Sequence, residues 1–168
     1  MHDLAELTLF LPGEIDWTGA AIPALEMTGW CAFRLKSAQR ADAVAETLGL
    51  PTMGCAASGA IAIGAGDWLM IAPETERETL AARLAETKHC YAADVSDALI
   101  MLDMGDTSTL IGRLTGLAPA RFGPGKAART KFAGVPAIFT STEKEEGVRV
   151  IFDISHARHI RAYLDVAA

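Results

Sequence analysis

Short apolar segments with a period of two recur along the chain and are interrupted by helical stretches. Cys31, Phe33 and Leu35 occupy every second position of one such segment, which predicts a strand with one buried face. Two apolar runs flank the glycine-rich turn at residues 64–66, a pattern typical of a hairpin. The expected strands are residues 30–36, 59–63, 67–71, 91–95, 99–104, 126–133, 135–140 and 148–153.

Four helices are expected between and after these strands. Ser37 is predicted to cap the first helix, which carries an apolar stripe. A second helix follows Pro73, has acidic residues in its early turns, as the helix dipole favours, and is expected to end near Lys88. Residues 107–114 form the third, and Ser155 is expected to cap the last helix.

The resulting order of elements is βαββαβ followed by βαβββα. Hairpins interleaved with helices favour an α+β fold with antiparallel sheet and helices on one face. We expect two intimately packed halves that share a sheet: a ferredoxin-like βαββαβ half at residues 29–96 and a second α+β half at residues 97–168. Residues 1–28 show no sustained period and are predicted to form an irregular N-terminal arm.

Composition narrows the class of protein. The chain has 168 residues, 51% of them hydrophobic, so it is long enough to bury a core without disulfide or metal staples. Its net charge of −6, without a run rich in Lys or Arg, disfavours a nucleic-acid partner. Three cysteines without CxxC spacing and the lack of a long apolar stretch predict a cytoplasmic protein that does not enter a membrane.

Two glycine-rich segments resemble phosphate-binding loops only in part. The turn at residues 64–66 lacks the third glycine of a dinucleotide fingerprint and leads into a strand instead of a helix. In residues 123–127, Ala127 stands where a P-loop needs Ser or Thr after the lysine, and Ala120 replaces its first glycine. Both segments are interpreted as turns.

Isolated polar residues provide weaker candidates. His156 and His159 are three residues apart and could approach one metal ion, although an ordinary solvated helix is the commoner explanation. Asp67, Asp94 and Asp97 lie in turns and could hold a substrate amine or act as a base, but such acids more often bond the local backbone. We therefore predict no catalytic, cofactor-binding or metal-binding residue in this chain.

Several segments, taken in order, resemble the gamma subunit of heterotetrameric sarcosine oxidases. The resemblance runs from about Gly29 to the end of the chain. The segments that carry it are residues 48–51 (Leu-Gly-Leu-Pro), 66–73 (Gly-Asp-Trp-Leu-Met-Ile-Ala-Pro), 94–97 (Asp-Val-Ser-Asp), 125–130 (Gly-Lys-Ala-Ala-Arg-Thr), 135–139 (Val-Pro-Ala-Ile-Phe) and 163–164 (Tyr-Leu).

This resemblance implies a fold like the folate-binding domain of aminomethyltransferases. It also implies a complex that oxidatively demethylates sarcosine to glycine, with tetrahydrofolate as the one-carbon acceptor. The expected partners are large alpha and beta subunits and a small delta subunit, and FAD, FMN, NAD and tetrahydrofolate are expected on those partner subunits. The family offers no catalytic residue at the positions that match here.

The leading hypothesis is therefore a non-catalytic structural subunit of a sarcosine oxidase-like complex, with Trp17, Trp30 and Trp68 as candidate contact residues. Of these, Trp68 alternates with strand residues, which favours a core position for it. One alternative is a folate-binding one-carbon transferase that uses Asp94 or Asp97 near the pterin, although fold analogy alone is a weak basis for it. A further alternative is a stand-alone module that binds a small ligand.

Overall fold

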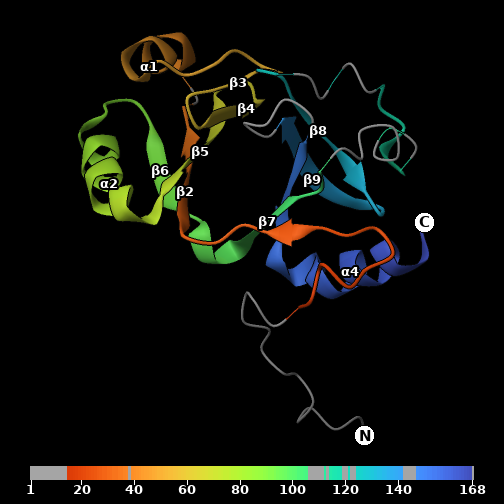
Figure 1. The fold of residues 1–168 in the computed structure, drawn as a ribbon. Coiled ribbons are helices and arrows are strands. Elements are labelled where there is room, and N and C mark those ends of the chain that lie inside the picture. The colour runs from red at the N-terminus through yellow and green to blue at the C-terminus, as the bar shows by residue number, and fades with distance from the viewer. Residues whose placement is uncertain are drawn as a thin grey trace, which may run out of the picture.

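The computed structural model describes residues 15–37, 39–105, 112, 114–118, 121, 124–141 and 147–167. Strands in this part form two antiparallel five-stranded sheets, and helices α1 (Ala41–Leu48), α2 (Arg77–Glu86) and α4 (Ala157–Val166) lie outside them (Figure 1). The expected α+β class with antiparallel sheets and helices on one face of each is confirmed. Among these residues, no helix is long and apolar enough to cross a membrane.

The first sheet has the strand order β3-β4-β5-β2-β6. Strand β2 pairs antiparallel with both β5 and β6, and helices α1 and α2 make the crossovers. Leaving out the short β3, this is the strand order and connectivity of a ferredoxin-like unit, as the sequence predicts. The strands are β2 (Trp30–Lys36), β3 (Ala56–Ala57), β4 (Ala60–Gly64), β5 (Asp67–Pro73) and β6 (Tyr91–Asp94).

The second sheet has the strand order β1-β7-β10-β9-β8, with every neighbouring pair antiparallel. Strands β8, β9 and β10 form a meander, and β10 leads through a short 3-10 turn, η5 (Ile154–His156), into α4. The strands are β1 (Leu25–Glu26), β7 (Leu99–Asp103), β8 (Ala127–Phe132), β9 (Val135–Ser141) and β10 (Val148–Asp153).

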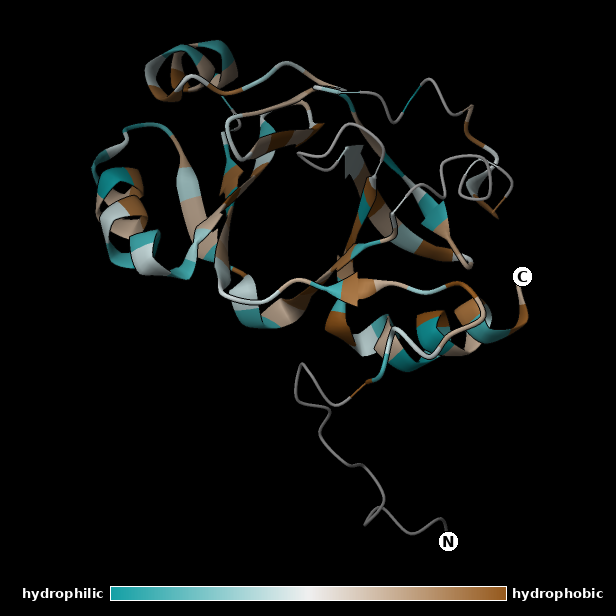
Figure 2. Cartoon of the chain, viewed as in Figure 1, coloured by the Kyte–Doolittle hydropathy of each residue, from teal (hydrophilic) through white to brown (hydrophobic). Residues whose placement is uncertain are grey.

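Alternation along the strands assigns each side chain to one of two layers. In β2, Phe33 and Leu35 pack under α1 and α2, whereas Ala32 packs toward the other sheet. In β10, Val150 packs with α4, whereas Ile151 faces the first sheet. Helices thus cover the outer faces, the inner faces pack on each other, and each helix carries both hydrophobic and hydrophilic residues (Figure 2).

The expected shared sheet is wrong, because the two halves form separate sheets joined at one corner. There, Cys55 and Lys126 form an isolated antiparallel bridge. The backbone N–H of Ala56 donates to the carbonyl of Gly125 at 2.9 Å, and that of Ala127 to the carbonyl of Gly54 at 2.9 Å. We call this set of backbone bonds the seam.

Both predicted helix caps are wrong. The backbone N–H of Ser37 donates to the carbonyl of Gly66 at 2.8 Å, which keeps Ser37 in the hairpin, so α1 begins after Arg40 without a side-chain cap. At the last helix, Asp153 takes the role expected of Ser155, because its carboxylate accepts from the N–H of Ser155 at 2.9 Å and starts the 3-10 turn.

Two other expectations involve segments that the structure describes only in part. The expected arm, residues 1–28, is not irregular throughout, since β1 pairs with β7 and Trp17 is buried in the core of the second sheet. Most of the helix expected at residues 107–114 lies outside the described residues. The division into domains at residue 96 stays a prediction.

The contact between the sheets can be tested with one substitution made at two places. Met101 is 2% exposed on the inner face of β7, whereas Met53 is 72% exposed. Met101→Ala removes buried apolar volume and should cost about 2–5 kcal/mol of unfolding free energy in urea denaturation. Met53→Ala should stay within about 0.5 kcal/mol of the parent. Equal effects would contradict the proposed core between the sheets.

The hairpin turn at residues 64–66 provides a second test. Gly66 has φ +66°, and a Cβ built there would lie 2.2 Å from the carbonyl oxygen of Ser37. Gly134 also has a positive φ, +84°, but nothing lies within 4 Å of its Cβ position. Gly134→Ala should cost about 1 kcal/mol from backbone strain, and Gly66→Ala clearly more, measured as urea midpoints. Similar losses of stability in the two variants would show that the contact between the new Cβ at position 66 and the carbonyl of Ser37 is relieved without cost.

Candidate functional site

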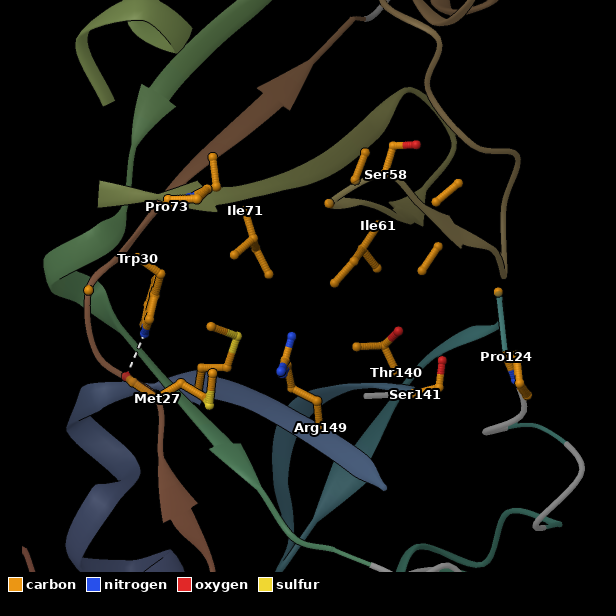
Figure 3. Close-up of a pocket in the computed structure, with 18 of the residues that line it drawn as sticks. Met27, Trp30, Ser58, Ile61, Ile71, Pro73, Pro124, Thr140, Ser141 and Arg149 are labelled. Atoms are coloured by element: carbon orange, nitrogen blue, oxygen red, sulfur yellow. Dashed lines mark hydrogen bonds between the residues drawn. The ribbon is translucent and has the colours of Figure 1, made fainter. Parts of the chain in front are cut away.

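A cavity of about 690 Å³ lies between the inner faces of the two sheets. Figure 3 shows Ile61 and Ile71 on one side, Arg149 and Thr140 on the other, and Trp30 at one end. The residues that line it are Met27, Thr28, Gly29, Trp30, Ala56, Ala57, Ser58, Gly59, Ala60, Ile61, Ile71, Ala72, Pro73, Met101, Pro124, Gly125, Thr140, Ser141 and Arg149.

Strand alternation explains why these side chains meet. Ile71, Met101 and Arg149 occupy inward positions of β5, β7 and β10, whereas their neighbours along each strand pack against helices. The seam closes one end of the cavity, since Ala56 and Gly125 belong to its lining. The inner faces of the two sheets are in contact at their centre, and the cavity lies next to this contact, where the faces are farther apart.

The crossing segment between β1 and β2 closes the other end. The backbone N–H of Met27 donates to the carbonyl of Met101 at 2.9 Å, and the carbonyl of Gly29 accepts from the N–H of Glu74 at 2.8 Å. The indole N–H of Trp30 donates to the carbonyl of Met27 at 2.6 Å, drawn as a dashed line in Figure 3. This bond fixes the half-buried indole ring as a wall of the cavity.

Arg149 is the one charged side chain among the described residues that line the cavity. Its guanidinium donates to Asp103 on the neighbouring strand, from Nε to Oδ1 at 2.7 Å and from Nη2 to Oδ2 at 2.9 Å. The two residues are direct cross-strand partners, and their side chains are only 19% and 22% exposed. A bidentate, largely desolvated pair of this kind holds the arginine in one orientation.

Hydroxyl groups supply the remaining polar side chains of the cavity. Thr140 is 6% exposed and donates its hydroxyl to the carbonyl of Lys126 at 3.3 Å. Ser141 lies next to it, and Ser58 lies across the cavity in the turn between β3 and β4, as Figure 3 shows. Together with Arg149, these groups can bind and orient a polar ligand through hydrogen bonds.

The candidate carboxylates lie elsewhere and stabilise local structure. Asp94 accepts from the hydroxyl of Ser96 at 2.6 Å and from its N–H at 3.0 Å, and it pairs with Arg77 at 3.2 Å. Burial raises the pKa of Asp94, but the bonds from Ser96 and the charge of Arg77 together lower it below its ordinary value of 3.8.

The other two acids have similar local positions. Asp97 is exposed, one residue after Ser96 in a 3-10 turn. Asp67 accepts from Arg34 in a bidentate pair, at 3.0 Å from Nε and 2.6 Å from Nη2. Asp67, Asp94 and Asp97 are all absent from the lining of the cavity. Local structural roles, the commoner explanation for such acids, thus agree with the contacts of Asp67 and Asp94.

The histidine pair does not form a metal site with other described residues. Nε2 of His159 lies 2.7 Å from the carbonyl oxygen of Ala133, within hydrogen-bond distance. His156 lies in η5, just before α4. Across the part of the chain that the structure describes, no three His, Cys, Asp or Glu residues are grouped so that they could hold a metal ion.

The three tryptophans differ in position. Trp17 and Trp68 are 2% and 4% exposed, and their indole N–H groups donate to Glu26 at 2.7 Å and to the carbonyl of Pro51 at 3.0 Å. Both are therefore core residues, which corrects the suggestion that Trp17 is a surface contact. Only Trp30 reaches an accessible surface, and that surface is the wall of the cavity.

Arg149, Thr140 and Ser141 were not singled out from the sequence. One signal was available, because Arg149 lies between apolar residues of β10 at a position that alternation places on the inner face. A long charged side chain at such a position needs a partner or a polar cavity. The partner, Asp103, is 46 residues away in sequence, so no local pattern connects the two.

The low pKa of Asp94 predicts a dependence of stability on pH. A lowered folded-state pKa stabilises the fold above the ordinary value of 3.8, and this contribution is lost as the pH falls through the folded-state value. Asp94→Asn should therefore cost about 1 kcal/mol at pH 7, and the difference from the parent should become smaller at acidic pH. Urea denaturation at pH 7 and pH 3 measures this, with Asp97→Asn as the control. A pH-independent difference would contradict it.

Comparison with known proteins identifies the fold. The sequence matches no family model and no curated protein. A chain of the heterotetrameric sarcosine oxidase from Corynebacterium sp. U-96, solved in complex with pyrrole 2-carboxylate, superposes with a TM-score of 0.69 and 20% identity. The alignment covers 86% of this chain and 82% of that chain.

A second solved structure is similar over a smaller part of its own length. The glycine cleavage system aminomethyltransferase T from Bartonella henselae superposes with a TM-score of 0.63 and 12% identity. The alignment covers 84% of this chain but only 44% of the aminomethyltransferase, so this chain spans less than half of that protein. The chain therefore has the fold shared by these two proteins, as the resemblance in its sequence implies.

Proposed function

We propose that this chain is a structural subunit, of the gamma type, in a sarcosine oxidase-like complex. The observation that carries the proposal is the reciprocal coverage of the alignment with a chain of the heterotetrameric enzyme, 86% and 82%, which means that the two chains match over most of both lengths. The match to the aminomethyltransferase covers 44% of that protein. The chain thus corresponds better to a whole small subunit than to a whole transferase.

The contacts of the candidate residues support a structural role. Asp67 and Asp94 are engaged in ion pairs and turn hydrogen bonds. The described side chains of the cavity supply hydroxyls and one guanidinium, which are groups suited to binding. In this proposal, FAD, FMN, NAD and tetrahydrofolate are bound by partner subunits, namely large alpha and beta chains and a small delta chain, and the complex is cytoplasmic and demethylates sarcosine.

Exposed apolar side chains on sheet edges provide candidate contacts with those subunits. Tyr91 on the edge strand β6 is 71% exposed, and Leu25 on the opposite sheet's edge strand β1 is 60% exposed. Exposed strand edges can pair with another chain, and aromatic residues are enriched in interfaces. These two edges replace Trp17 as the surfaces to examine.

Co-expression with the flavoprotein subunits of a sarcosine oxidase-like complex tests the proposal. The tagged chain should co-elute with them in fixed stoichiometry, and the complex should oxidise sarcosine with release of hydrogen peroxide. Adding the chain at about a hundredfold excess over its Kd should stabilise the partner subunits by about 2.7 kcal/mol. Failure to associate, or sarcosine turnover by the purified chain alone, would overturn the proposal.

The alternative of a folate-binding one-carbon transferase is favoured by one observation, the fold shared with aminomethyltransferase T. The residues suggested for it, Asp94 and Asp97, lie outside the cavity lining, so a structural role is the better supported proposal. Calorimetry of the purified chain with tetrahydrofolate distinguishes the two. Saturable binding together with methylene transfer would favour the transferase, and no heat change at millimolar ligand would exclude it.

A further inference from the structure

We propose that the cavity between the sheets binds a small carboxylate with a flat, apolar body, such as an aromatic acid. This site goes beyond the subunit role, since it is formed by this chain's own residues and does not depend on any partner. Its volume of about 690 Å³ falls within the range of roughly 300–1,000 Å³ found for small-molecule sites.

The apolar part of the ligand is matched by the end of the cavity near Trp30. Ile71 and Met101 lie on the two sheets beside the indole ring, as Figure 3 shows for Ile71 and Trp30. The hydrogen bond from Trp30 to the carbonyl of Met27 holds the ring in place before any ligand binds. A flat ligand can therefore stack on the indole without first ordering it, which lowers the entropic cost of binding.

The charged part of the ligand is matched by Arg149. Among the described residues of the lining, Arg149 is the one charged group, and its partner Asp103 lies outside the lining, so the guanidinium is the charged group that faces the cavity. A guanidinium has several N–H donors, and Asp103 accepts from two nitrogens, Nε and Nη2, which fixes the plane of the group. Held in this way at 19% side-chain exposure, Arg149 can recognise a carboxylate in a partly desolvated setting.

Thr140 and Ser141 extend this polar end of the cavity. Thr140 directs its hydroxyl proton to the carbonyl of Lys126, so its oxygen can accept from a protonated or hydroxylated ligand group. Ser141 can donate to a carboxylate oxygen beside Arg149. The cavity thus has an apolar wall at one end and a cation with hydroxyl groups at the other. This arrangement favours an amphipathic acid over a purely apolar or a purely ionic ligand.

Binding of 2-naphthoate to the purified full chain tests this inference, with 2-naphthamide as a neutral probe of the same shape and acetate as a probe without the ring. Isothermal calorimetry should give 2-naphthoate at least about tenfold tighter than either probe. Trp30→Ala should weaken 2-naphthoate by about tenfold through loss of the stacking wall. Equal affinity for acid and amide, or no saturable binding of 2-naphthoate at millimolar concentration, would overturn the proposal.

The charge is tested with the double substitution Arg149→Gln and Asp103→Asn, which removes both charges while keeping hydrogen-bonding groups on the paired strands. It should abolish the preference for acid over amide, whereas Arg129→Gln, an exposed arginine on β8 outside the cavity, should keep that preference. Ser141→Ala serves as a milder variant if the double variant has a lowered melting temperature, and it should weaken 2-naphthoate more than 2-naphthamide, because a hydrogen bond to a charged acceptor is the stronger one. An unchanged acid preference in folded variants would overturn the assignment to Arg149.

These measurements are independent of the subunit proposal. Ligand binding is measured on the chain alone, and assembly is measured by co-elution with the flavoprotein subunits. A chain that assembles but ignores 2-naphthoate would refute the ligand site only, and a chain that binds the acid but does not assemble would refute the subunit role only.

Discussion

The contact between the inner faces of the two sheets is the interaction on which the rest of the structure depends. Ala32 and Leu69 from the first sheet meet Met101 and Ile151 from the second, all nearly fully buried. Because helices cover the outer faces, each sheet is buried on both faces. The side chains on one face of a strand pack against helices, and those on the other face pack against the second sheet. Burial on both faces explains why strands such as β10 are apolar at successive positions.

The inner faces are not apolar throughout, and they carry two arginine–aspartate pairs. Arg34 with Asp67 and Arg149 with Asp103 each combine a strand arginine and a strand aspartate in bidentate geometry. Removing one member of such a pair would leave a partly buried charge without its partner, which is more costly than removing both. The Arg149–Asp103 pair borders the cavity through the side chain of Arg149.

Local sequence patterns were sufficient for most elements but not for the arrangement of the sheets. The alternation of Cys31, Phe33 and Leu35 predicts both β2 and the face that packs under the helices. The two predicted helix caps are wrong for different reasons. The backbone N–H of Ser37 donates to the carbonyl of Gly66, and the carboxylate of Asp153, in place of the Ser155 side chain, accepts at the start of the last helical segment. The cavity could not be predicted, since Arg149, Trp30 and Ile71 are distant in sequence and meet only after the sheets have packed.

The seam between the sheets has a consequence for divergence within this fold. Its bonds join backbone groups of Ala56, Gly125, Ala127 and Gly54, so they do not use the side chains that face the interior. The seam itself favours glycine at two positions, since Gly54 and Gly125 have φ +79° and +70°. Mutational drift can therefore alter the residues that face the interior while the two layers keep their mutual orientation. Such tolerance is consistent with a common architecture at 20% and 12% identity, and it would let related chains acquire different ligand preferences on an unchanged framework.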